Sequence, residues 1–239
     1  LVNMDRFYNL FEKLPIIGMI HLAGESPVKR ALQEIEVFER NGIDAAIIED
    51  YHGSIEDVLE TMQELSKREN KIILGINVLS NPYSSFHIAN QYGAQFVQFD
   101  TVLTPRLNLD LYNKKREAFP EILVFGGVGF KYQPTSQNTL DYDIKQGKER
   151  CEVIVTTGDG TGIETPIEKL IIYKEKLKDF PLIVGAGVKL ENVYDQLKVV
   201  DGAIIGSRLK KFNQTHNKLD RHKINDLMDI VKTVRLERY

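Results

Sequence analysis

The stretch LIVGAGVKLENV, residues 182–193, ends an apolar run on two glycines, and a helix-like pattern follows them. Glycine inside a strand costs stability, so Gly185 and Gly187 need a physical reason. Either they form a tight turn, or they let a ligand approach the backbone closely. The run before them is continuously apolar, which is typical of a strand covered on both faces. The stretch therefore predicts the end of a buried parallel strand.

Seven further runs of this kind occur along the chain, rich in isoleucine and valine and separated by segments with helical spacing. The eight predicted strands cover residues 16–22, 45–50, 71–79, 96–100, 122–130, 153–158, 181–187 and 202–207. Helical patterns lie between them, and Gly42 and Gly93 fit the left-handed positions that end helices.

Strands that alternate with helices imply a parallel sheet with right-handed crossovers. Eight such units in a chain of this length predict one domain over residues 1–239, a (β/α)8 TIM barrel. The alternative is an open doubly wound sheet, which normally carries a phosphate loop after its first strand. Here the first strand ends in MIHLAGES, which lacks that loop, so the barrel is favoured.

The composition of the chain indicates which binding partners and which cellular compartment to expect. The chain has 239 residues, a net charge of −3 and one cysteine, Cys151. We expect no nucleic-acid partner because no basic field is available, and the single cysteine fits a reducing, cytoplasmic location. The opening LVNMDRFYNLFEK is not typical of a signal peptide, and no apolar run predicts a transmembrane segment. Barrels of this size often form dimers, so the sequence is compatible with a homo-oligomer.

Polar residues close most of the apolar runs, at the end where TIM barrels carry their active sites. Close carboxylates raise one another's pKa and can act as acid and base, and they can also hold Mg²⁺. The alternative for each is a structural role in an ion pair or a turn. We predict no other cofactor. The candidate catalytic residues are His21, Glu49, Asn77, Asp100 and Lys131, with Glu49, Asp50 and Asp100 as possible Mg²⁺ ligands.

Three glycine-rich segments follow the last three strands: TTGDGTGIETP, VGAGVKLEN and IIGSRLKKF. Bare backbone N–H groups at such ends can approach anionic oxygens, and many barrels bind phosphate there. None is a Walker loop or a complete dinucleotide fingerprint. The predicted ligand is a phosphorylated small molecule, with TTGDGTG as a mobile lid. The predicted phosphate-binding residues are Gly158, Gly160, Gly185, Gly187, Gly206, Ser207 and Arg208.

The blocks IIGMIHL, AAIIEDY, ILGINVLSNP, VIVTTGDGTG, LIVGAGVKLENV and DGAIIGSRLK resemble the successive motifs of the BtpA family. That family is grouped with ribulose-phosphate-binding barrels, so the resemblance implies a barrel and a phosphate pocket without a known reaction. The chain departs from the family in the short AGESPVK loop, in QFDTVLTPRLN, and in GFKYQP. The last keeps Lys131 but has Tyr132 where members tend to have histidine.

Two functions are compatible with these residues. The first is an enzyme, an isomerase, lyase or transferase acting on a phosphorylated substrate through acid–base groups. The second is a non-catalytic assembly or regulatory barrel, such as a complex biogenesis factor, with a vestigial or sensing phosphate site. Because a degraded site would be expected to lose its acids, the retention of Glu49, Asp100 and Lys131 favours the enzyme.

Overall fold

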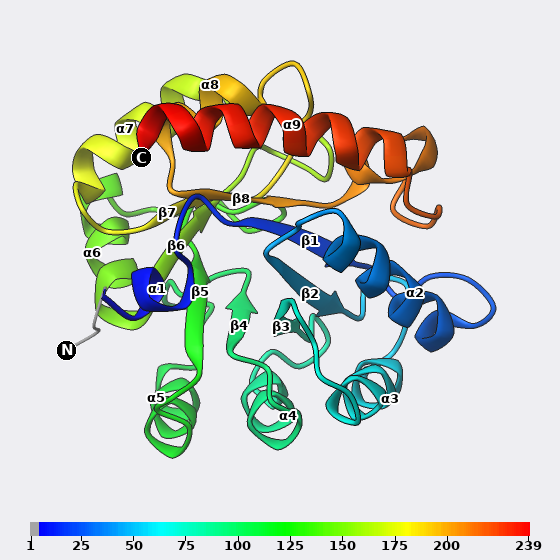
Figure 1. Ribbon diagram of the computed structural model, residues 1–239. Helices are drawn as coiled ribbons and strands as arrows, with labels where there is room; N and C mark the ends of the chain where they lie inside the picture. Colours follow the sequence, from blue (N-terminus) through cyan, green and yellow to red (C-terminus); the bar gives the residue numbers. More distant parts are fainter. Residues whose placement is uncertain (1–4) are drawn as a thin grey trace.

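A computed structural model describes residues 5–239, and its eight parallel strands close into a barrel in chain order (Figure 1). This confirms the predicted (β/α)8 barrel. Residues 1–4, which the predicted domain includes, lie outside the described residues. The strands are β1 (Ile16–Ile20), β2 (Ala45–Glu49), β3 (Ile73–Asn77), β4 (Phe96–Phe99), β5 (Leu123–Gly127), β6 (Val153–Thr156), β7 (Leu182–Val184) and β8 (Gly202–Ile205).

Each predicted range contains one strand, but the strands end earlier than the apolar runs do. The stretch that opened the prediction is an example, because β7 stops at Val184. Gly185 still donates its amide to the Thr156 carbonyl at 2.9 Å, and then the chain turns at Gly187 with φ of +67°. The residues beyond each strand are therefore free to form the loops of one barrel end.

Helices surround the barrel, and a last helix runs along its β8 side (Figure 1). Gly42 and Gly93 have φ of +74° and +80°, as predicted for residues that end helices. The helices are α1 (Asp5–Leu10), α2 (Pro27–Arg40), α3 (Ile55–Ser66), α4 (Ser84–Tyr92), α5 (Leu109–Ala118), α6 (Leu140–Arg150), α7 (Ile167–Leu177), α8 (Val193–Val199) and α9 (Arg221–Arg238), with short 3₁₀ turns η1 (Ser207–Leu209) and η2 (Lys211–Asn213).

Alternation along the strands divides the apolar residues into two buried layers. On β2, Ala45 and Ile47 belong to the barrel interior, whereas Ala46 and Ile48 belong to the layer between strands and helices. The same period of two carries Glu49 inward at the end of β2. The barrel interior therefore becomes polar only at the carboxyl ends of its strands.

Helix α1 closes the opposite end of the barrel. Its Phe7 and the following Phe11 pack against Phe125 from inside β5, each with ring centroids 6.2 Å apart, and Phe96 stacks on Phe125 at 4.3 Å. Among the described residues, these aromatic side chains fill the amino-terminal end of the barrel interior, whereas a pocket opens at the carboxyl end. Among the described helices, none is long and apolar enough to cross a membrane.

Candidate active site

Two carboxyl groups and one amide form the centre of the polar end. Asn77 ends β3 beside Glu49 in the strand register, and its Nδ2 donates to Glu49 Oε2 at 2.9 Å and to Asp100 Oδ1 at 3.1 Å. Gln98 Nε2 donates to the same Asp100 oxygen at 3.1 Å. Three predicted residues are therefore brought together. Gln98 was not predicted, although a polar residue two positions before Asp100 in an apolar strand was a usable signal.

Burial gives this pair unusual acid–base properties. Burial first, and the neighbouring Asp100 second, raise the pKa of Glu49 to about 8. Burial also raises the pKa of Asp100, while hydrogen bonds from Gln98 and Asn77 oppose the rise by stabilising its charged form. At neutral pH Glu49 is therefore largely protonated, and the two carboxyls are chemically different.

His21 follows β1 and lies beside the pair on the pocket wall. Burial and the positive charge of Lys210 lower the pKa of His21 well below its ordinary value, so the ring is neutral. Its ring meets the Tyr51 ring edge-on, with centroids 5.3 Å apart. A neutral imidazole can donate from one nitrogen and accept at the other.

Lys131 follows β5 and completes the predicted set. Its amide donates to Thr157 Oγ1 at 2.6 Å, which fixes the backbone at the pocket edge. Among the described residues its ammonium has no hydrogen-bond or ion-pair partner, and it lies 5.9 Å from the centre of the Phe130 ring. Its charge lies close enough to oppose the rise that burial causes in the pKa of both Glu49 and Asp100.

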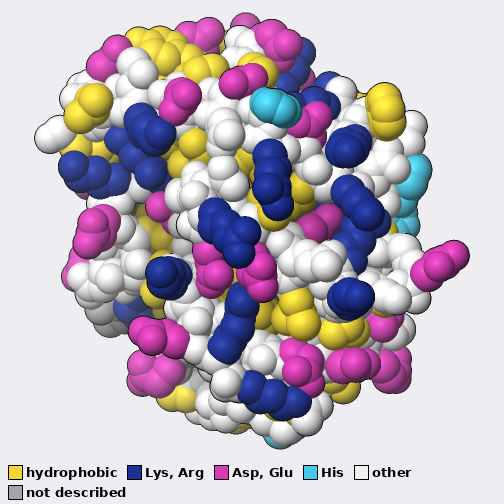
Figure 2. All heavy atoms as spheres, turned by 45° about the vertical axis from the view of Figure 1, so that its right-hand side comes forward, with side chains coloured by type: hydrophobic (Ala, Val, Ile, Leu, Met, Phe, Trp, Pro, Cys, Tyr) yellow, Lys and Arg dark blue, Asp and Glu magenta, His cyan; other side chains and the backbone are white. Residues whose placement is uncertain are grey.

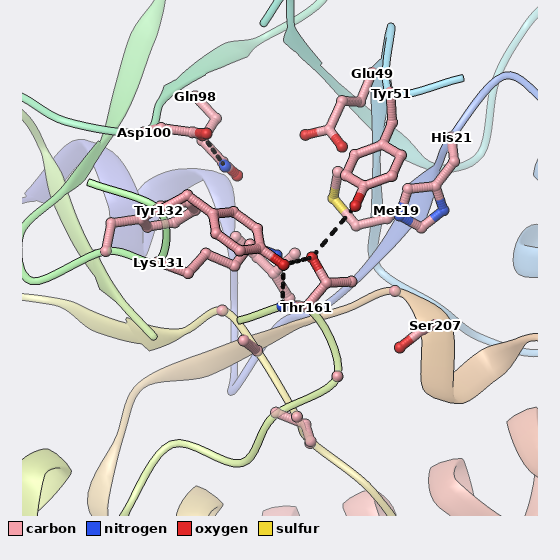
Figure 3. Close-up of a pocket in the computed structure, with 18 of the residues that line it drawn as sticks. Met19, His21, Glu49, Tyr51, Gln98, Asp100, Lys131, Tyr132, Thr161 and Ser207 are labelled. Carbon is pink, nitrogen blue, oxygen red and sulfur yellow. Dashed lines mark hydrogen bonds between the residues drawn. The ribbon is translucent and has the colours of Figure 1, made fainter. Parts of the chain in front are cut away.

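These groups face one small pocket, of about 90 Å³ (Figure 3). Figure 3 shows Glu49 and Asp100 toward one side of it and Ser207 toward another, with Met19 below Tyr51. The lining residues are Met19, His21, Glu49, Tyr51, Leu79, Gln98, Asp100, Phe130, Lys131, Tyr132, Thr161, Gly162, Gly185, Ala186, Gly187, Val188, Ile204, Gly206, Ser207 and Arg208.

The side of the pocket beyond β7 and β8 offers donors for an anion. The backbone amides of Gly187, Gly206, Ser207 and Arg208 have no hydrogen-bond acceptor among the described residues. Arg208 Nη2 donates to the Gly162 carbonyl at 3.0 Å, which holds the guanidinium in place, while its buried Nε has no partner. Unpaired amides and a positioned guanidinium are the groups that bind phosphate oxygens.

The two glycines of the opening stretch also have a packing role. A Cβ at Gly187 would lie 2.3 Å from the Ile163 carbonyl oxygen, and one at Gly185 would lie 2.8 Å from Val155 Cγ1. Both glycines therefore allow close packing of the neighbouring loop and strand. The turn-forming role that the sequence left open is real, and it is compatible with a free amide at Gly187.

Some predicted residues lie elsewhere. Gly158 lines a neighbouring cavity instead of this pocket, and Gly160 packs against Ile163, whereas the unpredicted Gly162 reaches the pocket. Asp50 accepts hydrogen bonds from the Leu79 amide at 2.6 Å and from Ser80 Oγ at 2.6 Å, so its carboxylate fixes the β3–α4 loop.

The described residues 5–239 contain no group of three His, Cys, Asp or Glu side chains arranged to hold a metal ion. Glu49 and Asp100 supply two oxygen-bearing groups, and Asp50 is engaged in the loop. The donor set therefore does not fit an Mg²⁺ ion held by three carboxylates.

Comparison with known proteins agrees with this architecture. The model of the BtpA family matches residues 12–233. The chain belongs to the BtpA family. It is similar to an uncharacterized protein of Archaeoglobus fulgidus, with 28% identity over 82% of this chain and 91% of that one. It is also similar to the photosystem I biogenesis protein BtpA of Synechocystis, with 23% identity over 95% and 91% of the two chains.

Among solved structures, this BtpA-family protein resembles N-(5'-phosphoribosyl)anthranilate isomerase from Pyrococcus furiosus. The TM-score is 0.62 and the identity 15%, over 92% of this chain and 99% of the other. At this identity the likeness shows the shared barrel fold.

The pocket of this BtpA-family protein is closed by contacts between three loops, which we call the latch (Tyr51, Tyr132 and Thr161). The Thr161 amide donates to the Tyr132 hydroxyl at 2.9 Å, and the Thr161 hydroxyl lies 3.2 Å from the Tyr132 oxygen and 3.5 Å from the Tyr51 oxygen. Figure 3 shows both tyrosine hydroxyls pointing toward Thr161. Sequence patterns did not predict the latch, because it joins loops after β2, β5 and β6.

Three buried polar atoms without partners belong to residues of this one pocket: His21 Nδ1, Gln98 Oε1 and Arg208 Nε. Buried polar groups are normally hydrogen-bonded, so their gathering here indicates a place for a polar ligand. On the face drawn in Figure 2, acidic and basic side chains are interspersed, with no continuous basic field. Attraction for an anion would therefore come from the local groups of the pocket.

Proposed function

We propose that this BtpA-family barrel is an enzyme that binds a phosphorylated small molecule and transfers a proton on it. The phosphate lies against the amides of Gly187 and Ser207 and against Arg208. The carbon that reacts lies beside Glu49 and Asp100. The reaction class is an isomerase, lyase or transferase step with general acid–base catalysis.

One observation carries this proposal: a buried carboxyl pair and a set of unpaired anion donors line the same pocket. Either feature alone has a structural explanation. Together they supply what acid–base chemistry on a phosphorylated compound requires. The anion donors hold the phosphate in a fixed position, and the two carboxyls differ in proton affinity. The Pyrococcus structure of similar fold is of an enzyme named for a phosphoribosyl compound, and this supports the class of ligand at the level of fold analogy.

The roles of the two carboxyls follow from their surroundings. Glu49, whose pKa is raised to about 8, keeps a proton that it can donate to a substrate oxygen. Asp100 accepts hydrogen bonds from two amides, which stabilise its charged form and leave it as the base. The Lys131 ammonium stabilises negative charge that develops on the substrate between them.

The experiment is a thermal-shift screen of the purified protein against matched pairs, each a phosphorylated compound and its dephosphorylated form. A ligand at 100 times its Kd raises stability by about 2.7 kcal/mol, which is readily seen in the melting temperature. We expect shifts for sugar phosphates and none for the free sugars. Ser207→Ala and Arg208→Gln should reduce those shifts. Arg221→Gln should not, because Arg221 is solvent-exposed and its side chain has no hydrogen-bond or ion-pair partner among the described residues. Equal responses to both members of every pair would contradict the proposal.

The second candidate is a non-catalytic assembly factor, favoured by the name of the Synechocystis relative. Under this function the pocket senses a phosphorylated ligand without converting it. Once a ligand is found, the two candidate functions are distinguished by whether the protein converts it. An enzyme converts the ligand, and Asp100→Asn abolishes the conversion but not the binding. A sensor binds the ligand and returns it unchanged.

A further inference from the structure

The pocket beside the carboxyl pair is one of three adjoining cavities. Its volume is about 90 Å³. A second cavity, of about 760 Å³, adjoins the first, and the segment of Phe130, Lys131 and Tyr132 lines both cavities. A third, of about 160 Å³, shares Asp100 with the first and Arg106 with the second. Asp100 therefore lines the first and third cavities, and Arg106 lines both the third cavity and the largest one.

Arg106 is the cation with free donors in the wall between the second and third cavities. Among the described residues, Arg106 and Arg221 are the two arginines whose side chains make no hydrogen bond or ion pair. Other arginines near this end are engaged, as Arg150 is with the Val102 carbonyl at 2.6 Å. A planar guanidinium with all donors free is suited to bidentate binding of a carboxylate.

The remaining charges of the large cavity are mostly engaged. Asp143 accepts from Ser136 Oγ at 3.0 Å, and Lys169 donates to the carbonyls of Gly129 and Thr157 at 2.8 and 2.6 Å. Asp159 lies exposed on the loop after β6, where its charge favours the charged form of Lys169. Lys131, in the wall shared with the first pocket, is the other cation of this cavity that has no hydrogen-bond or ion-pair partner among the described residues.

We propose that the substrate carries a second anionic group, a carboxylate held by Arg106, at the end opposite its phosphate. The inference rests on the proposed function and names the substrate class of the same site. With the phosphate against Ser207 and Arg208 and the carboxylate at Arg106, the carbons between the two groups pass Glu49 and Asp100. Both ends of such a substrate are fixed, and the reacting carbon lies where the acid and the base are.

The test compares phosphorylated acids with the matched phosphorylated alcohols, in which a hydroxymethyl group replaces the carboxylate. The probes are phosphoglycerate with glycerol phosphate, and phosphogluconate with sorbitol phosphate, each with its phosphate at the far end. Binding is measured by calorimetry on the full chain. In at least one pair the acid should bind about tenfold more tightly than the alcohol, because a charge-assisted bond is added. Arg106→Gln should remove this preference without changing the affinity for the alcohol. Arg221→Gln should leave both unchanged.

The outcomes separate the two proposals. If the alcohols bind and no acid binds better, or if Arg106→Gln keeps the preference, the second subsite is refuted while the phosphate site stands. If neither acids nor alcohols bind, and inorganic phosphate does not bind either, the proposed function fails and this inference fails with it.

Discussion

Asn77 Nδ2 lies 2.9 Å from Glu49 Oε2 and 3.1 Å from an oxygen of Asp100, so one amide at the end of β3 joins two carboxyl groups from the ends of the strands on either side of it, β2 and β4. The amide fixes both acids at the mouth of the barrel, where burial raises the pKa of each carboxyl and the neighbouring Asp100 raises that of Glu49 further.

Replacing Glu49 by glutamine should change how stability depends on pH. The pKa of Glu49 is about 8 in the folded protein against an ordinary value of 4.5, so between these values the folded state binds more protons than the unfolded state. Stability from this group is therefore lost as pH rises through that window. Glu49→Gln should be more stable than the wild type at about pH 9 by about 2–5 kcal/mol, and closer to it at about pH 5. Urea unfolding at the two pH values measures this. The exposed Glu60→Gln is the control, and a parallel response of the two variants would rule out the raised pKa.

Replacing Asp100 by asparagine should abolish turnover while the fold is kept. The substitution keeps the shape of the side chain and removes the base, and general acid–base groups supply about 10²–10⁴-fold in rate. The rate is measured on a substrate found in the phosphate screen, with circular dichroism to monitor the fold. Asp226→Asn, on the exposed face of α9, is the matched control. Full activity of Asp100→Asn would remove this residue from the mechanism.

Replacing Tyr132 by phenylalanine should loosen the latch. The phenol oxygen accepts from the Thr161 amide, and an exposed hydrogen bond of this kind contributes about 0.5–1.5 kcal/mol. Hydrogen exchange in residues 158–164 should therefore quicken by about 2- to 12-fold without ligand, and a bound phosphorylated ligand should slow it. Tyr142→Phe, another exposed tyrosine, should leave the exchange unchanged. Slow exchange in Tyr132→Phe would show that other contacts hold the loop.

Replacing Lys210 by methionine should destabilise the fold and disturb the phosphate side. Lys210 is buried with its ammonium 2.8 Å from Glu34 Oε2, and this pair ties the segment after β8 to α2. Removing one partner of a buried pair typically costs about 3–5 kcal/mol, and the nearby Arg30, 3.2 Å from Glu34, reduces that cost. Chemical denaturation measures the loss. The double variant Glu34→Gln, Lys210→Met should recover part of it, and a single variant as stable as the wild type would contradict this role.

The sequence predicted the barrel because its signals are local: buried parallel strands read as continuous apolar runs, and Gly42 and Gly93 end helices. The same reasoning placed Glu49, Asn77 and Asp100 at strand ends. It could not separate Glu49 from Asp50, since adjacent residues face opposite sides and only the closed sheet decides which side is the interior. Gly158 and Gly160 were grouped with the phosphate residues for a different reason, because the path of a loop depends on its contacts with other loops.

The latch and Arg106 show a second limit. Tyr51, Tyr132 and Thr161 come from three different loops, and no spacing in the sequence relates them. Arg106 stands out through the absence of a partner and through the cavities beside it, which are properties of the folded chain. Periodicity and motif spacing contain no information about either.

The proposed function requires that a phosphate group binds between the ends of β7 and β8. The most direct measurement is a crystal structure of the protein grown or soaked in phosphate. We expect an anion within hydrogen-bonding distance of the Gly187 and Ser207 amides and of the Arg208 guanidinium. An empty position there, in crystals that hold phosphate elsewhere on the molecule, would contradict the claim and leave Gly185 and Gly187 as turn-forming residues alone.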